Sequence, residues 1–189
     1  MSLEQGVIMM QGLPCSGKTT TSRKMIGFDN LVFESTDNLR GEIHRVDPFN
    51  PSDRSAVYDA LFFKVRARLN EGRNLLVDAT FSSKSRRNVV YSLCSEFRAS
   101  LIIVTCTAPD VVLRTRMATR IKSGDLPSFF LVDTLGLVSS ENELVSFEEV
   151  SGLEQVALIT FDTDAETLLE NHCKGRPKFY DQVKRVLRR

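Results

Sequence analysis

Several residue types that build common kinds of site are scarce in this chain. Its 189 residues contain no tryptophan, only two histidines and only four cysteines. No two cysteines stand in a C-x-x-C pair, and neither His44 nor His172 has ligand-like neighbours. We therefore expect neither a zinc site nor a disulfide framework, and we interpret the cysteines as reduced thiols of a cytosolic protein.

Long apolar runs and an excess of one charge are also lacking. No run of about 18 apolar residues occurs, so a transmembrane helix is not expected, and the N-terminus lacks the basic and apolar pattern of a secretory signal. The net charge is +1, so overall charge does not argue for a nucleic-acid partner, although a local basic patch would be compatible with it. We expect one cytoplasmic domain over residues 1–189.

Short apolar runs alternate with longer amphipathic stretches along the chain. Such continuous apolar runs are typical of strands buried on both faces of a parallel sheet. We predict strands at 7–10, 31–35, 74–78, 101–106 and 156–161, and helices at 18–26, 55–70, 84–97, 110–121, 163–172 and 179–189. The alternation predicts an α/β fold. Since ligands bind where parallel strands end, Gly12, Asp37, Asp78 and Thr163 should gather around one crevice.

The run from Gly12 to Thr19, GLPCSGKT, fits the phosphate-loop pattern G-x-x-x-x-G-K-[ST]. Its glycines let the backbone curl and turn N–H groups toward phosphates, Lys18 supplies positive charge, and the Thr19 hydroxyl can hold Mg²⁺. The run follows an apolar strand and precedes a helical stretch, as this mechanism requires. The predicted nucleotide-binding residues are Gly12, Pro14, Cys15, Ser16, Gly17, Lys18, Thr19 and Thr20.

The rest of the sequence favours a small kinase among the classes that use this loop. A GTPase should carry an N-K-x-D motif, and none is present. The D-x-x-G run at Asp133 lies too far downstream to be a GTPase switch. A motor ATPase should have an acidic pair after a strand, but Asp78 is followed by Ala79.

Two acids follow predicted strands and are candidates for phosphoryl transfer. Asp37 should face the phosphate loop across the crevice, where a carboxylate could orient an acceptor hydroxyl and take its proton. Alternatively, Asp37 only caps a short helix. Asp78, with Thr80 beside it, could touch Mg²⁺ through water, hold a substrate-binding arginine, or be a simple strand-end residue.

Two arginines follow the fourth predicted strand. Arg116 and Arg120 are four residues apart and share a helical face, so they could clamp phosphates in a lid over residues 114–128. The Ser123-Gly124 step would let that lid move. A solvated basic face is the alternative interpretation.

With these motifs, the chain resembles P-loop kinases related to polynucleotide 5′-hydroxyl kinase and to zeta-toxin-like kinases. The resemblance covers residues 6–170, and its motifs are GLPCSGKT, STDNLR, VDATF, the arginines that begin at Arg114, and FEEV followed by ITFDTD. It implies a three-layer fold whose five parallel strands have the order 2-3-1-4-5, with flanking helices and an arginine-bearing lid. A basic C-terminal helix over 178–189 would follow.

The resemblance also implies roles for individual residues. Asp37 would be the general base, Lys18 and Thr19 would serve ATP and Mg²⁺, and Arg40 would contact the acceptor. Arg116 or Arg120 would act in the lid, as a catalytic arginine. The loop near Thr163 would lie close to adenine. From its place after the third predicted strand, Asp78 is predicted with Thr80 and Arg40 to bind the substrate.

The acceptor is left open by the sequence. A polynucleotide 5′-hydroxyl is favoured by Arg40, Arg86, Arg87 and the basic tail from Lys174 to Arg189. The near-neutral charge and the lack of a clear aromatic and basic groove argue against it. A small-molecule hydroxyl, as on a sugar, an antibiotic or a nucleotide-sugar, is the alternative. A nucleotide-binding regulator without phosphoryl transfer is a third.

Overall fold

The computed structural model describes residues 5–28, 30–43, 50–124, 150, 156–172 and 177–188. The strands are β1 (Gly6–Gln11), β2 (Leu31–Ser35), β3 (Asn74–Asp78), β4 (Ser100–Thr107), β5 (Ala157–Asp162) and β6 (Thr167–His172). The helices are α1 (Lys18–Met25), α2 (Thr36–Glu42), α3 (Pro51–Asn70), α4 (Lys84–Glu96), α5 (Asp110–Lys122) and α7 (Tyr180–Leu187). The predicted motif at Asp133, the last part of the lid, most of FEEV and Lys174 lie outside the described residues.

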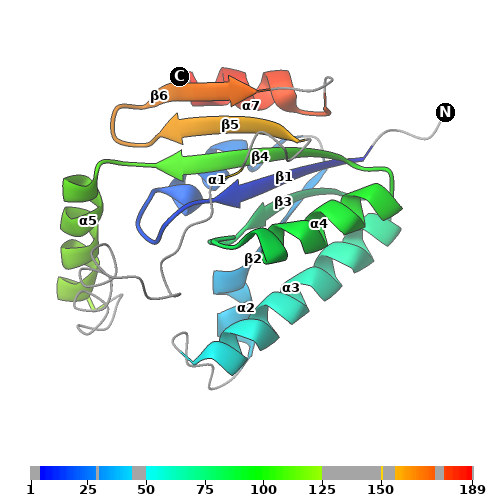
Figure 1. Cartoon of the computed structure of the whole chain (residues 1–189), viewed down its shortest axis with the longest axis horizontal. Coiled ribbons are helices and arrows are strands. Elements are labelled where there is room, and N and C mark those ends of the chain that lie inside the picture. The colour runs from blue at the N-terminus through cyan, green and yellow to red at the C-terminus, as the bar shows by residue number, and fades with distance from the viewer. Residues whose placement is uncertain are drawn as a thin grey trace.

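The strands form one sheet with the order β2-β3-β1-β4-β5-β6 (Figure 1). The first five strands are parallel and have the predicted order, but β6 is antiparallel to β5. The helix predicted over 163–172 is therefore wrong. A tight turn follows β5 instead, in which the Asp162 carboxylate accepts hydrogen bonds from the N–H groups of Asp164 and Ala165. With Glu166 at a φ of 50°, the chain reverses and continues as a strand.

Helices cover both faces of the sheet, which gives the three predicted layers (Figure 1). Alternate residues of the central strand point to opposite sides: Val7 and Met9 belong to the core beneath α2, α3 and α4, whereas Ile8 and Met10 belong to the core beneath α1 and α7. This burial on both faces explains why the strands read as continuous apolar runs. No helix within the described ranges is long and apolar enough to cross a membrane.

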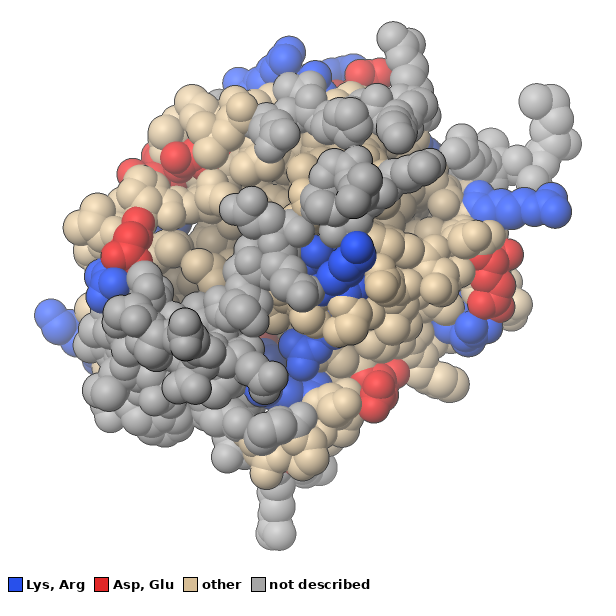
Figure 2. All heavy atoms as spheres, in the orientation of Figure 1, with Lys and Arg blue, Asp and Glu red and all other residues tan. Residues whose placement is uncertain are grey.

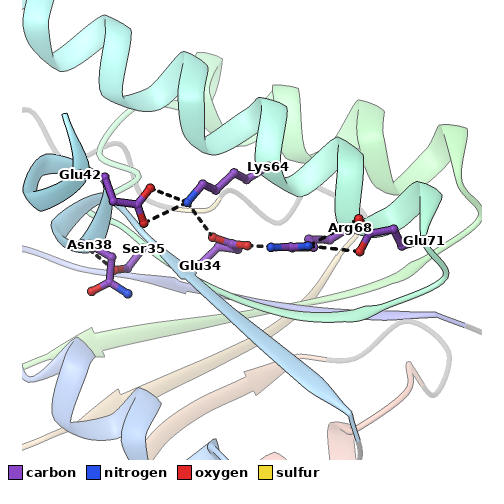
Figure 3. A network of polar contacts seen from close by, with 7 residues as sticks. All are labelled: Glu34, Ser35, Asn38, Glu42, Lys64, Arg68 and Glu71. Carbon is purple, nitrogen blue, oxygen red and sulfur yellow. Dashed lines mark hydrogen bonds and ion pairs between the residues drawn. The ribbon is translucent and has the colours of Figure 1, made fainter.

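A network of charges fastens the edge strand β2 to α2 and α3 (Figure 3). The Glu34 carboxylate is almost fully buried; it accepts a hydrogen bond from Arg68 Nε at 3.0 Å and lies 3.8 Å from Lys64 Nζ. Lys64 also pairs with Glu42 of α2 at 2.7 Å, and Arg68 pairs with Glu71 at 3.2 Å. The network therefore holds α2, which carries Asp37 at its other end, against α3.

The parallel strands end together at one edge of the sheet. Asp78, the last residue of β3, is in register with Met10 of β1 and with Ser35, the last residue of β2. Thr107 of β4 is likewise in register with Asp162 of β5. This edge, at the arrowheads of the parallel strands in Figure 1, collects the segments that the sequence predicts to form the site.

Candidate active site

The loop from Gly12 to Thr19 is wrapped so closely that two of its positions accept only glycine. Gly12 and Gly17 have φ values of 145° and 86°, where other residues are strained. A Cβ at Gly12 would overlap the carbonyl oxygen of Cys106, and one at Gly17 would lie 2.9 Å from Thr163 Oγ1. The loop is therefore fitted closely against the ends of β4 and β5.

Lys18 closes this loop and begins α1. Its ammonium donates to the carbonyl oxygens of Gly12 at 2.9 Å and Leu13 at 2.8 Å. Burial lowers the pKa of Lys18, while the carboxylates of Asp78 and Asp37 act to raise it. The hydroxyl of Ser16 is buried and has no hydrogen-bond partner among the described residues. A partly desolvated ammonium and a helix N-terminus that converge on one loop suit a phosphate chain.

Thr19 and Asp78 supply a pair of oxygen ligands beside the loop. The Thr19 hydroxyl donates to Asp78 Oδ2 at 3.0 Å, and the Ser22 hydroxyl lies 3.4 Å from the same oxygen. Burial raises the pKa of Asp78, and the positive charge of Lys18 partly offsets that effect. Mg²⁺ in nucleotide sites takes one or two protein oxygens together with phosphate oxygens and water. The oxygen atoms of Thr19 and Asp78 are the kind of donor that Mg²⁺ takes, so these two residues fit a metal ion beside the loop.

Asp37 and Arg40 lie on α2, directly after β2. The cap of α2 is Ser35, whose hydroxyl oxygen accepts from the N–H of Asn38 at 3.1 Å, so Asp37 is not needed as the cap. Its carboxylate is largely exposed and pairs with Arg40 Nη1 at 2.6 Å. It is near enough to Lys18 and Asp78 to influence the pKa of both. Thr80 lies nearby and accepts a hydrogen bond from the N–H of Gly12 through its carbonyl.

Arg116 of α5 reaches back to the phosphate loop. Its guanidinium donates to Thr163 Oγ1 at 2.9 Å and to the Thr163 carbonyl at 3.3 Å, and it lies 3.5 Å from the carbonyl of Cys15. The Thr163 hydroxyl in turn donates to the carbonyl of Ser16 at 2.9 Å. Arg120, one turn further along α5, is exposed. Thr163, expected near adenine, thus lies between the loop and Arg116.

Two basic features that the sequence suggested for nucleic-acid binding lie elsewhere. Arg87 is fully buried and donates to the carbonyl of Phe81, so it does not face a nucleic acid. Lys178, in the basic tail, contacts Asn74 and Ser100, which are the first residues of β3 and β4. It therefore lies at the edge of the sheet opposite the phosphate loop.

The structure adds two residues that the sequence analysis did not name, Arg54 and Tyr58, to Arg86, which it did. Arg54 and Tyr58 are one turn apart on α3, and the guanidinium of Arg86 lies 4.1 Å from the centre of the Tyr58 ring. The Tyr58 hydroxyl accepts the N–H of Phe81 at 3.1 Å. No motif surrounds these residues in the sequence. The one feature that could have pointed to them is that Arg54 and Tyr58, four residues apart, place polar groups on the same face of α3.

Comparison with known proteins agrees with this geometry. The sequence matches the family described as AAA domain (AAA_33) over residues 7–136, which is more than half of the chain. It is 30% identical over 138 residues to human 6-phosphofructo-2-kinase/fructose-2,6-bisphosphatase 3, which covers 63% of this chain and 26% of that protein. The rat protein of the same name is 29% identical over 138 residues. The chain thus spans about a quarter of the length of these relatives.

Solved structures show the same fold. A presumed kinase from Chloroflexus aurantiacus superposes with a TM-score of 0.66 at 20% identity, over 84% of this chain and 85% of that one. The APS kinase CysC of Mycobacterium tuberculosis, solved with AMPPNP and APS, gives 0.59 at 16% identity, over 97% and 96%. A chain of the Pnkp1/Rnl/Hen1 RNA repair complex gives 0.59 at 20% identity, over 83% and 52%. The three-layer P-loop architecture is common to all of them.

Proposed function

The chain belongs to the AAA_33 family of P-loop kinase domains, and from this premise we propose that it transfers the γ-phosphoryl group of ATP to a hydroxyl. One observation carries the proposal. The anion-binding loop with Lys18, the Thr19–Asp78 pair and the carboxylate of Asp37 lie at the same edge of the sheet, on neighbouring strand ends. A donor site and a candidate base are therefore adjacent.

The donor half of the site would bind the phosphates of ATP. The loop N–H groups and the N-terminus of α1 would face the phosphates. The Lys18 ammonium would exchange the carbonyls of Gly12 and Leu13 for phosphate oxygens. Thr19 and Asp78 would hold Mg²⁺, which neutralises and orients phosphates when bound. Arg116 is positioned beside the loop, so it and Arg120 are the candidates for countering the charge that develops on the transferred group.

Asp37 would serve the acceptor half of the reaction. The acceptor oxygen forms a bond to the γ-phosphorus, the bond from that phosphorus to the β–γ bridging oxygen breaks, and ADP leaves. The proton of the acceptor hydroxyl passes to the Asp37 carboxylate, while Arg40, paired with it at 2.6 Å, holds that carboxylate in place. Because Asp37 is largely exposed, it can be reached from solvent by an acceptor.

Two acceptor classes remain candidates, a polynucleotide 5′-hydroxyl and a small-molecule hydroxyl. Of the basic residues proposed to bind a polynucleotide, Arg40 and Arg86 lie on the acceptor side, whereas Arg87 is buried and Lys178 lies at the opposite edge. The remaining cluster is compact and favours a small acceptor over an extended strand. The relatives named 6-phosphofructo-2-kinase also favour a small-molecule acceptor, because their name refers to one.

A transfer screen tests the proposal. The protein is incubated with Mg²⁺ and γ-labelled ATP against 5′-hydroxyl DNA and RNA, sugars, sugar phosphates and nucleosides, with Lys18→Ala as the matched inactive variant. We expect label on at least one hydroxyl acceptor with the natural protein and at least a hundredfold less with Lys18→Ala. Tight ATP binding without transfer to any acceptor would instead favour the nucleotide-binding regulator.

A further inference from the structure

The acceptor side of the site contains three arginines that come from three different elements. Arg40 lies on α2, Arg54 on α3 and Arg86 near the start of α4. All three are half-buried. The guanidinium of Arg86 lies 4.1 Å from the centre of the ring of Tyr58, which is one helical turn from Arg54 on α3. Figure 2 shows basic side chains gathered near the middle of the face drawn in Figure 1, while acidic side chains lie mostly nearer the rim of that view.

This cluster is short of negative charge. Arg40 pairs with Asp37, but neither Arg54 nor Arg86 forms an ion pair with a carboxylate of the described residues. The Nε atoms of Arg40 and Arg54 are buried and have no hydrogen-bond partner within the described part of the chain. Burial lowers the pKa of the Arg54 guanidinium, and the charges of Arg86 and Arg40 lower it further. Bringing these cations together costs free energy that a bound anion would recover.

The arrangement of the cluster suits a phosphate group. A guanidinium presents its N–H donors as a planar fork that matches two oxygens of a phosphate. One carboxylate of a ligand would be matched by one arginine, whereas a phosphate monoester carries close to two negative charges and three terminal oxygens. Arg86 is fixed in orientation by the Tyr58 ring, and Tyr58 is fixed by the N–H of Phe81. The donors are therefore held in place before any ligand arrives.

We propose that Arg54 and Arg86, beside Arg40, form a subsite for a phosphate group on the acceptor, which makes the acceptor a phosphate ester that also carries a free hydroxyl. The inference rests on the proposed kinase function, because it places this phosphate next to Asp37 while the hydroxyl meets the base. The phosphate could belong to a sugar phosphate or to a nucleoside 3′-phosphate, and both offer the same chemistry to the arginines.

Phosphate binding tests the subsite without knowledge of the acceptor. The full chain is titrated with inorganic phosphate by calorimetry, beside Lys18→Ala, the double variant Arg54→Met/Arg86→Met, and Arg66→Met as the control. Arg66 is also on α3, but it is about half exposed and pairs with Glu96. We expect two phosphate sites: Lys18→Ala removes the loop site, and the double variant weakens the other at least tenfold, while Arg66→Met changes neither.

The two proposals fail in different ways in this experiment. If Lys18→Ala keeps both phosphate sites, this result would count against phosphate binding by the loop and hence against the kinase function. Unchanged phosphate binding in the double variant would overturn the arginine subsite alone. Arg54→Lys and Arg86→Lys keep the charge but lose the fork, so they should fold normally and weaken phosphate less than the methionine changes do.

Competition at the arginine subsite then distinguishes the two sources of phosphate. Ribose 5-phosphate and adenosine 3′-monophosphate are each added to Lys18→Ala protein that is loaded with inorganic phosphate, with ribose and adenosine as unphosphorylated controls. Displacement by one or both phosphate esters, but not by the controls, supports the assignment and names the source. If neither ester displaces inorganic phosphate, a phosphate-ester acceptor is ruled out.

Discussion

Replacing Thr163 by valine tests how Arg116 is held against the phosphate loop. Valine keeps the branched shape but removes the hydroxyl, which accepts from Arg116 at 2.9 Å and donates to the Ser16 carbonyl at 2.9 Å. A hydrogen bond to a charged group contributes about 1.5–3 kcal/mol, and a neutral one about 1 kcal/mol. Because the Arg116 side chain is 32% exposed, water replaces part of the loss, and we expect Thr163→Val to destabilise the protein by about 1–2 kcal/mol.

Thermal unfolding and nucleotide titration measure this effect together. For a protein of this size, each kcal/mol lowers Tm by about 2–4 °C, so the expected drop is about 2–8 °C. ATP affinity should fall several-fold, because Arg116 and the Ser16 carbonyl both lose their hydrogen bond to the Thr163 hydroxyl. Thr119→Val is the control, since Thr119 is exposed on α5 and, among the described residues, its hydroxyl donates to the Thr115 carbonyl of its own helix. Equal Tm and ATP affinity in Thr163→Val and the natural protein would refute the reasoning.

Further predictions concern the charge network beneath α3 and the buried thiols. Lys64→Met and Arg68→Met should each lower the free energy of unfolding only slightly, because Glu34 keeps one partner in either variant. The double variant leaves the buried Glu34 carboxylate unpaired and should lower the free energy of unfolding by about 2–4 kcal/mol, as measured by urea unfolding. A loss in the double variant equal to the sum of the two single losses would contradict this. Burial raises the pKa of Cys94 to about 12 and of Cys106 to about 11. Both should therefore stay as thiols at pH 8 and resist alkylation until the protein unfolds, with reactivity that rises as pH approaches those values; rapid labelling of the folded protein would contradict their burial.

Much of the sheet could be predicted from the sequence because its signals are local. The strands at 31–35 and 74–78 were predicted with the bounds that the structure has, since buried parallel strands appear as short apolar runs. The phosphate loop was predictable for a similar reason, because its glycines and lysine act within eight consecutive residues. The order of the first five strands came from the resemblance and is confirmed.

The features that were missed depend on contacts between distant segments. The segment from Thr167 to His172 became a strand because β5 offers an open edge and the turn at Asp162 reverses the chain. Arg87 looked like a surface residue of a helix, yet it is buried against the Phe81 carbonyl. Arg40 and Arg86 were named from the sequence, but Arg54 was not, because the cluster joins three elements and no stretch of sequence contains it.

The most direct test of the central claim is the rate of phosphoryl transfer in Asp37→Asn, measured together with ATP binding. The amide keeps the size of the side chain and leaves the phosphate loop intact, but it cannot accept the proton of the acceptor hydroxyl. We predict unchanged affinity for ATP with Mg²⁺ and a rate of transfer to the acceptor found in the screen that falls by about 10²-fold or more. Transfer at the natural rate in Asp37→Asn would contradict the account, because the acceptor hydroxyl would then not need this carboxylate.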